Sequence, residues 1–296
     1  MTSPSILVTG GSGFLGARLA SRLSNEGEAV IAPARNELPL DDVAEVTSFL
    51  RTYSVDRVVH LAACTDRREE PGAHEDQWRD TFGAGRILAT ACAQARVRLV
   101  VAAGSMDEVG TSEDRVVTPD APPAPSSTYG LCKTLLLETF RYLAPRSGMQ
   151  VEWVRPTAIY GPGQTGPMLV PSAFAAAIGQ GSAQFTSGMQ RRDFVYVDDV
   201  IEWLSRAQSM TVTAPTVTVH HLGSGKPISV RSVLQEIGRI TGSSFGVGAV
   251  PRRPGEPNVV GVPPYSDKRA PLDGWAPTTS LIDGLQLTWQ WWKDHA

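Results

Sequence analysis

The stretch ILVTGGSGFLG, residues 6–16, constrains the fold of this chain more than any other feature. A short apolar run meets glycines at positions 10, 13 and 16 and then becomes an amphipathic segment. A strand, turn and helix of this kind place backbone N–H groups at a helix N-terminus, where the helix dipole favours a phosphate. Gly10 suits the tight turn, Gly13 the approach of a pyrophosphate, and Gly16 the packing of helix on sheet. The stretch therefore predicts a dinucleotide site.

Short β-branched runs alternate with helical patterns through the first half of the chain. We expect strands at 6–10, 29–34, 56–63, 98–105 and 151–161, and helices at 17–27, 42–53, about 76–95 and about 128–144. This alternation predicts an α/β fold, a Rossmann doubly wound parallel sheet. After about residue 160 the elements shorten and prolines and glycines come closer together. We expect an NAD(P)-binding Rossmann domain over 1–160, to which some later segments return, and over 161–296 a smaller α/β lobe that binds substrate.

Composition limits the class of partner. The 296 residues are 42% hydrophobic and 19% charged, with a net charge of -3 and no basic run. Nucleic acid and anionic membranes are therefore not expected partners, and an anionic ligand needs a few placed arginines. The cysteines at 64, 92 and 132 form no CxxC pair, which predicts neither a disulfide framework nor a metal site. With a first apolar run too short for a leader or a membrane span, we expect a soluble cytoplasmic protein.

The second expected strand bears on the choice of cofactor. A carboxylate at its end would bind a ribose 2′-hydroxyl, whereas an arginine accommodates a 2′-phosphate. In AVIAPARNE the place of the acid holds Ala34, and Arg35 follows. This favours NADP(H), with NAD as the alternative and a solvated surface charge as the other interpretation of Arg35.

A second pattern points to proton transfer. Tyr129 and Lys133 are four residues apart, and therefore lie on one face of the expected helix. A tyrosine has a reference pKa of about 10, and a neighbouring ammonium lowers it by stabilising the phenolate. Ser105 ends the preceding strand at the carboxyl edge of the sheet, where ligands bind in doubly wound folds. Its hydroxyl is placed to donate to a carbonyl oxygen while the tyrosine supplies the proton.

These residues belong to a longer series of motifs that occur in order. The series is TGGSGFLG, HLAA at 60–63, Ser105, YGLCK at 129–133, RPTAIYGPG at 155–163, RRDFVYVDDV at 191–200, RRPGEP at 252–257 and DKRAPLDGWAP at 267–277. Together they resemble the extended short-chain dehydrogenase/reductases, the NAD(P)-dependent epimerases, dehydratases and reductases that act on nucleotide sugars. The resemblance covers essentially the whole chain.

The resemblance implies roles for individual residues. Tyr129 exchanges the proton, Lys133 holds the cofactor ribose and tunes the tyrosine, and Ser105 polarises the sugar hydroxyl or ketone. Arg192 and Arg253 match arginines that clamp the nucleotide diphosphate; the alternative is that Arg192 pairs with Asp193 or Asp198. A homodimer is expected. The expected cofactor contacts are Gly10, Gly13, Phe14, Leu15, Gly16, Arg35, Asp41, Leu61, Ala62, Ala63, Tyr129, Lys133, Pro156 and Ile159.

The chain departs from the family pattern near the sugar. Val109 stands where the family has a tyrosine, Asp80 where it has an asparagine, and Ala158 at another asparagine position. The acids of the 4,6-dehydratases would fall at Met106 and Asp107, and only a one-residue deletion would place them at Asp107 and Glu108. Dehydration is therefore disfavoured.

The expected activity follows from Arg35. Because NADPH is a consumed reductant, the sequence favours NADPH-dependent reduction of a nucleotide-linked keto-sugar, such as a dTDP-4-keto-6-deoxyhexose. Tyr129 would protonate the oxygen while nicotinamide supplies hydride. The alternatives are an NAD-dependent nucleotide-sugar 4-epimerase with the same three residues and a non-catalytic dinucleotide-binding scaffold.

Overall fold

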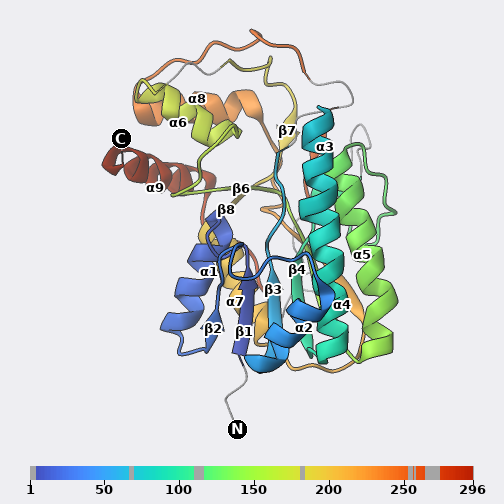
Figure 1. The fold of residues 1–296 in the computed structure, drawn as a ribbon. Coiled ribbons are helices and arrows are strands. Elements are labelled where there is room, and N and C mark those ends of the chain that lie inside the picture. The colour runs from blue at the N-terminus through green and yellow to red at the C-terminus, as the bar shows by residue number, and fades with distance from the viewer. Residues whose placement is uncertain are drawn as a thin grey trace. The chain divides into compact units, whose positions relative to one another are not determined.

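A computed structural model describes residues 5–66, 70–109, 117–180, 184–252, 256, 258–263 and 274–295 (Figure 1). The chain forms two compact units. Unit 1 comprises Met1–Gly110, Pro119–Arg155 and Ile201–His220, and unit 2 comprises Thr111–Thr118, Pro156–Val200 and His221–Ala296. The main change of unit thus falls between Arg155 and Pro156, and a later segment returns to unit 1. Cofactor binding by the first and substrate binding by the second stay predictions.

Unit 1 is built on a six-stranded sheet of order β2-β1-β3-β4-β5-β9. The strands are β2 (Val30–Ile31), β1 (Ser5–Thr9), β3 (Val55–His60), β4 (Leu99–Ala103), β5 (Gln150–Pro156) and β9 (Val217–Leu222). All described pairs from β2 to β5 are parallel. Every residue of β1 is buried, as expected for a strand covered on both faces. The predicted Rossmann-like α/β fold is confirmed.

Helices cover both faces of this sheet (Figure 1). They are α1 (Phe14–Asn25), α2 (Val43–Thr52), α3 (Pro71–Gln77), α4 (Ala84–Ala95), α5 (Thr128–Ser147) and the part of α7 (Val197–Gln208) from residue 201 on. α2, α4 and α5 pack side by side. Leu50, Leu88, Leu136 and Phe140 from these helices are buried in one core with Val100 of β4.

Three of the expected elements are shorter or divided in the structure. The expected strand at 29–34 is only two residues long and stops before Pro33, which has no N–H for a ladder. The expected helix near 76–95 is three segments, because the six-residue π-helical segment η1 (Trp78–Gly83) separates α3 from α4. The expected strand at 151–161 divides into β5 and β6 (Ala158–Tyr160) around Thr157.

The described part of unit 2 contains two small sheets, three helices and the first turn of α7. β6 pairs in parallel with β8 (Phe194–Tyr196). The second sheet has the order β10 (Ile228–Ser229), β7 (Arg191–Arg192), β11 (Val259–Val260). The helices are α6 (Leu169–Ala177), α8 (Val230–Thr241) and α9 (Leu281–Asp294). Phe174 of α6 stacks on Trp289 of α9 with ring centroids 5.5 Å apart, so this indole packs the two helices together.

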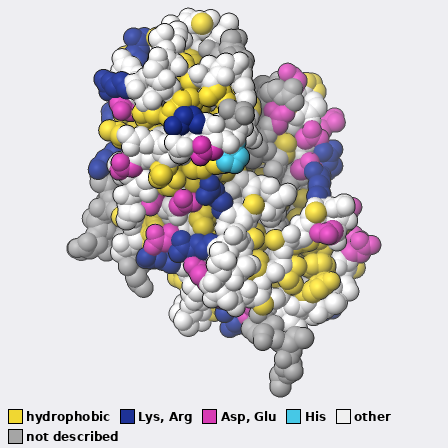
Figure 2. All heavy atoms as spheres, turned by 90° about the vertical axis from the view of Figure 1, so that its left-hand side faces the viewer, with side chains coloured by type: hydrophobic (Ala, Val, Ile, Leu, Met, Phe, Trp, Pro, Cys, Tyr) yellow, Lys and Arg dark blue, Asp and Glu magenta, His cyan; other side chains and the backbone are white. Residues whose placement is uncertain are grey.

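The surface agrees with the charge balance of the sequence. On the face in Figure 2, lysine and arginine side chains are interspersed with acidic and hydrophobic ones. In the described part of the chain, no helix combines the length and apolar character needed to span a bilayer.

Candidate active site

The strand order of unit 1 reverses at β1, because β2 and β3 flank it. Ligands of doubly wound sheets bind outside the carboxyl ends of the strands at such a switch point. The glycine turn lies at this place, between β1 and α1 (Figure 1).

The backbone geometry explains why glycine stands at positions 10, 13 and 16 of the turn. Gly10 has φ +73°, and a Cβ there would lie 2.9 Å from the Ala62 nitrogen. A Cβ on Gly16 would lie 2.1 Å from the carbonyl oxygen of Gly10, so the third glycine allows the helix to approach the turn itself. Gly13 begins the helix with extended backbone and offers no side-chain cap to the first N–H groups. A cradle of this kind fits a pyrophosphate.

The residues after β3 border this turn. Leu61 donates its N–H to the carbonyl oxygen of Thr9 at 3.2 Å, and Ala62 donates to the Thr9 hydroxyl at 3.4 Å. The structure therefore brings the predicted contacts Leu61, Ala62 and Ala63 beside the glycine turn. Phe14 and Leu15 form the first turn of α1.

The remaining predicted cofactor contacts lie further along the chain. Asp41 is exposed, and it directly precedes Asp42, which caps α2. Pro156 and Ile159 belong to unit 2, as the end of β5 and the middle of β6. These three stay predictions.

The Arg35 side chain is already engaged in an ion pair. Its Nη2 atom donates to Oδ1 of Asp80 at 2.5 Å, although the arginine side chain is 75% exposed. Asp80 also accepts from Nε of Arg79 at 2.8 Å. Hydrogen bonds from Arg79 and then Arg35 hold the pKa of Asp80 below its usual value. The arginine that the sequence assigned to a 2′-phosphate already has an anionic partner.

Ser105 lies two residues after the end of β4 and caps the short helix η2 (Met106–Glu108). Its Oγ atom accepts the N–H of Asp107 at 3.1 Å, which leaves its own hydroxyl proton for donation. The start of α5 packs closely on η2, because a Cβ on Gly130 would lie 2.3 Å from the carbonyl oxygen of Asp107. The helix that carries Tyr129 and Lys133 is therefore held against the turn that carries Ser105.

Lys133 is deeply buried beside Tyr129. It is 1% exposed, its Nζ atom donates to the carbonyl oxygen of Ala103 at 2.7 Å, and the same atom lies 5.8 Å from the centroid of the Tyr129 ring. Burial lowers the pKa of Lys133 to about 8, while the nearby charge of Glu108 opposes the shift. A cation at this distance favours the phenolate form of a tyrosine.

A buried ionic cluster below Ser105 was not anticipated from the sequence. Glu108 is fully buried and accepts from the Ser105 N–H at 2.6 Å, from Nε of Arg155 at 2.9 Å and from Nε1 of Trp153 at 3.1 Å. Burial raises the pKa of Glu108, and the Arg155 charge works against that rise. A carboxylate held in this way supports the architecture and is not placed to eliminate water from a sugar. Trp153 and Arg155 are two residues apart on β5 and so face the same side of the sheet, a pattern that could have indicated a shared partner.

His60 at the end of β3 is a second buried group near Lys133. Its Nδ1 atom lies 2.7 Å from the Thr9 hydroxyl oxygen. Burial, assisted by the charge of Lys133, lowers the pKa of His60 to about 3, so the ring is neutral at physiological pH. It packs beneath the glycine turn and carries no charge to the site.

In unit 2, Arg192 pairs with Glu256 through Nη2 and Oε1 at 2.5 Å. The alternative partner Asp193 is instead fully buried and accepts from the Ser224 N–H at 2.7 Å and the Gly225 N–H at 3.0 Å. Arg253, the second predicted clamp residue, lies outside the described residues.

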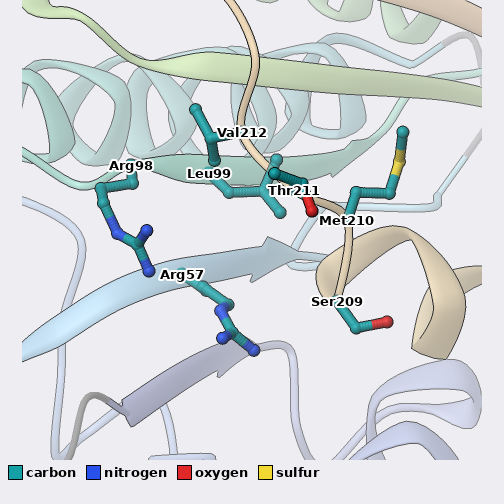
Figure 3. Close-up of a pocket in the computed structure, with 7 residues that line it drawn as sticks. All are labelled: Arg57, Arg98, Leu99, Ser209, Met210, Thr211 and Val212. Carbon is teal, nitrogen blue, oxygen red and sulfur yellow. The ribbon is translucent and has the colours of Figure 1, made fainter.

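A cavity of about 260 Å³ lies at the opposite edge of the sheet of unit 1. It is lined by Arg57, Arg98, Leu99 and residues 209–212 (Figure 3). Asp56 accepts from Nε of Arg98 at 3.1 Å, and its Oδ1 atom lies 4.0 Å from Nε of Arg57. The cavity is separate from the Ser105 turn, because Leu99 begins the strand that Ser105 follows.

Comparison with known proteins gives a consistent result. The model of a family described as the NAD dependent epimerase/dehydratase family matches residues 6–218. A UDP-glucose 4-epimerase of Lactobacillus helveticus is 25% identical over 325 residues, which cover 98% of this chain and 97% of that protein.

The solved structures with high similarity include MoeE5 in two complexes. MoeE5 with UDP-glucuronic acid and NAD is 28% identical with a TM-score of 0.88, covering 99% of this chain and 100% of that one. MoeE5 with UDP-glucose and NAD is 27% identical with a TM-score of 0.88, covering 98% and 99%.

Proposed function

This chain belongs to the NAD dependent epimerase/dehydratase family, and we propose that within it the chain is an NAD-dependent 4-epimerase of UDP-linked sugars. The observation that carries the proposal is the buried Lys133 beside Tyr129, on a helix packed against the Ser105 turn. The relatives support the rest, because they include UDP-glucose 4-epimerases and a protein solved with NAD and UDP-sugars.

The comparisons favour this alternative over the ketoreductase that the sequence suggested. The preference for NADPH rested on Arg35, and Arg35 is paired with Asp80. The similar structures carry NAD. An epimerase needs no net reductant, since a dinucleotide held at the turn of Gly10, Gly13 and Gly16 would supply both the oxidation at C4 of the sugar and the reduction that follows it.

Three side chains would transfer the proton of the C4 hydroxyl and bind its oxygen. Tyr129, as phenolate, accepts the proton of the C4 hydroxyl during oxidation and returns it during reduction. The Lys133 ammonium stabilises the phenolate between the two steps. The Ser105 hydroxyl donates to the sugar oxygen when it is a carbonyl, because accepting the Asp107 N–H leaves its own proton for donation. The proton balance closes within one turnover.

We assign the binding of the cofactor to residues of unit 1 and the binding of the sugar nucleotide to residues of unit 2. Gly10, Gly13 and Gly16 would hold the pyrophosphate of NAD against the start of α1, with Leu61 to Ala63 alongside. Arg192 and Arg253 would hold the diphosphate of the sugar nucleotide, because a guanidinium suits bidentate phosphate contacts.

We further propose a homodimer through α5. Leu131 and Tyr142 are eleven residues apart, about three helical turns, and so share one face of that helix. Both are exposed, as is Trp78 on η1, which packs against α5. A second copy would cover these apolar side chains.

The proposed function is tested on purified protein without added nicotinamide. Nucleotide released by denaturation is identified by chromatography, and the native protein is incubated with UDP-glucose and UDP-glucuronic acid. We expect bound NAD and formation of the C4 epimer of at least one substrate. Bound NADP, or turnover only with stoichiometric NADPH, would show that the protein is a reductase and not an epimerase.

A further inference from the structure

We propose that Asp80 sets the cofactor preference of this chain, because it holds the Arg35 guanidinium that would otherwise bind a 2′-phosphate. The inference rests on the proposed dinucleotide site. It goes beyond that site by naming the residue that makes NAD, and not NADP, the nucleotide bound there.

Arg35 occupies the part of the fold that distinguishes the two cofactors. It follows β2, which runs parallel to β1 with Leu7 opposite Ile31, so both strands end at the same edge of the sheet. The two loops are in contact there, because a Cβ on Gly11 would lie 2.8 Å from the Ala32 Cβ. In folds of this class an arginine at this place accommodates a 2′-phosphate.

Asp80 reaches Arg35 from a different element. It lies on the π-helical segment η1, and its side chain is only 15% exposed. It accepts from Nη2 of Arg35 at 2.5 Å and from Arg79 at 2.8 Å through Nε and 3.1 Å through Nη2. Two guanidinium groups thus share one carboxylate.

The local charge balance does not favour a phosphate dianion. Glu37 is also near, since its Oε2 atom accepts the Ala34 N–H at 2.7 Å. Arg79 is further engaged by Asp76 at 2.5 Å. Among the described residues, Asp76 and Asp80 thus pair with the two arginines, and Glu37 lies two residues after Arg35. A 2′-phosphate would have to displace Asp80 from Arg35, whereas the 2′-hydroxyl of NAD is neutral and meets no such competition.

The sequence contains a matched control. Asp76 lies one turn before Asp80 on the same stretch of helix and pairs with Arg79, while Asp80 pairs with both arginines. Neutralising Asp76 changes the regional charge by the same amount as neutralising Asp80, and it leaves the Arg35 to Asp80 contact in place.

The experiment is a direct binding titration of NADH and NADPH on protein freed of nucleotide, followed by nicotinamide fluorescence. The variants are Asp80→Asn, Asp76→Asn, Arg35→Ala and the double variant Arg35→Ala with Asp80→Asn. A charge-assisted contact supports an expected gain of about tenfold in NADPH affinity for Asp80→Asn, with NADH affinity unchanged. Asp76→Asn should change neither, and the gain should vanish when Arg35 is absent.

Unchanged NADPH affinity in Asp80→Asn would overturn the inference. An equal gain in Asp76→Asn, or a gain that survives Arg35→Ala, would also overturn it, because the effect would then be one of general charge. If wild type binds NADH while Asp80→Asn gains nothing, the proposed epimerase stands and only this inference fails. If wild type binds neither nucleotide, the dinucleotide site itself is wrong, and the inference falls with it.

Discussion

The Nζ atom of Lys133 lies 5.8 Å from the centre of the Tyr129 ring, one turn further along the same face of α5. Tyr129 and Lys133 are both buried, and Lys133 is anchored to the carbonyl oxygen of Ala103 at the end of β4. The pair is thereby fixed beside the Ser105 turn before any substrate arrives.

Replacing Tyr129 with phenylalanine should abolish epimerisation and leave cofactor binding nearly intact, because only the phenolic proton is lost. Loss of a general acid and base supports a decrease in kcat of about 10²–10⁴-fold. Tyr53→Phe is the control, since Tyr53 is an exposed tyrosine at the end of α2 with no assigned role. Activity of Tyr129→Phe within tenfold of wild type would reject the tyrosine as the proton carrier.

The pH dependence follows from Lys133. Burial lowers its pKa to about 8, so the ammonium beside Tyr129 is lost as the pH rises through that value. We therefore expect kcat to fall as the pH rises above about 8. The groups that face Lys133 are Glu108, Cys132, Tyr129 and the neutral His60. A flat kcat profile across this range would contradict the role of the ammonium.

The ionisation of Lys133 should also affect stability, but in the opposite direction: the free energy of unfolding should rise with pH where kcat falls. An unfolded lysine keeps its proton up to its ordinary value of 10.5, while the folded one releases it near 8. Between these values the unfolded chain binds more protons, so the Lys133 contribution to the free energy of unfolding rises with pH. Urea unfolding of wild type and Lys133→Met at both ends of this window measures the difference, which should move in favour of wild type as the pH rises.

Gly130 tests the contact between α5 and η2. A Cβ there would lie 2.3 Å from the Asp107 carbonyl oxygen, so Gly130→Ala must shift the start of α5, which carries Tyr129 and Lys133. Misplacement of about 1 Å supports a loss of around 10²-fold in kcat. Gly72→Ala is the control, because no atom lies within 4 Å of the added Cβ. Equal activity of both variants would show that this contact does not position Tyr129.

Substitution of Arg192 tests the proposed binding of the sugar nucleotide by unit 2. Arg192→Ala should weaken UDP binding by more than about tenfold and leave NADH affinity unchanged, because a desolvated charged contact to the diphosphate is lost. Calorimetric titration of each ligand checks this. Since Glu256 is the partner of Arg192, Glu256→Gln should have a smaller effect on UDP than the arginine variant. Unchanged UDP affinity in Arg192→Ala would remove Arg192 from the clamp.

The parts of this protein that follow from local backbone chemistry could be predicted from the sequence. Gly10 is required by its positive φ, and the alternation of strand and helix patterns determines the parallel sheet. Tyr129 and Lys133 follow from helical spacing, and Ser105 from its place at the end of a strand.

The contacts that escaped prediction join residues distant in sequence. Arg35 and Asp80 are separated by 45 positions, Glu108 and Arg155 by 47, and Arg192 and Glu256 by 64. Periodicity reports which face of an element is buried, and it does not report which element lies opposite. The sequence favours NADP through Arg35 alone. The structure pairs Arg35 with Asp80, and the similar structures carry NAD.

The most direct measurement of the central claim follows the hydrogen at C4 of the sugar. UDP-glucose and UDP-glucuronic acid that carry deuterium at C4 are incubated with the purified protein without added nicotinamide, and the products are examined by NMR and mass spectrometry. A 4-epimerase that returns the same hydride predicts the C4 epimer with deuterium retained at C4 and no net change in nicotinamide absorbance. Loss of the deuterium from C4, or no epimer unless NADPH is supplied and consumed, would contradict the account.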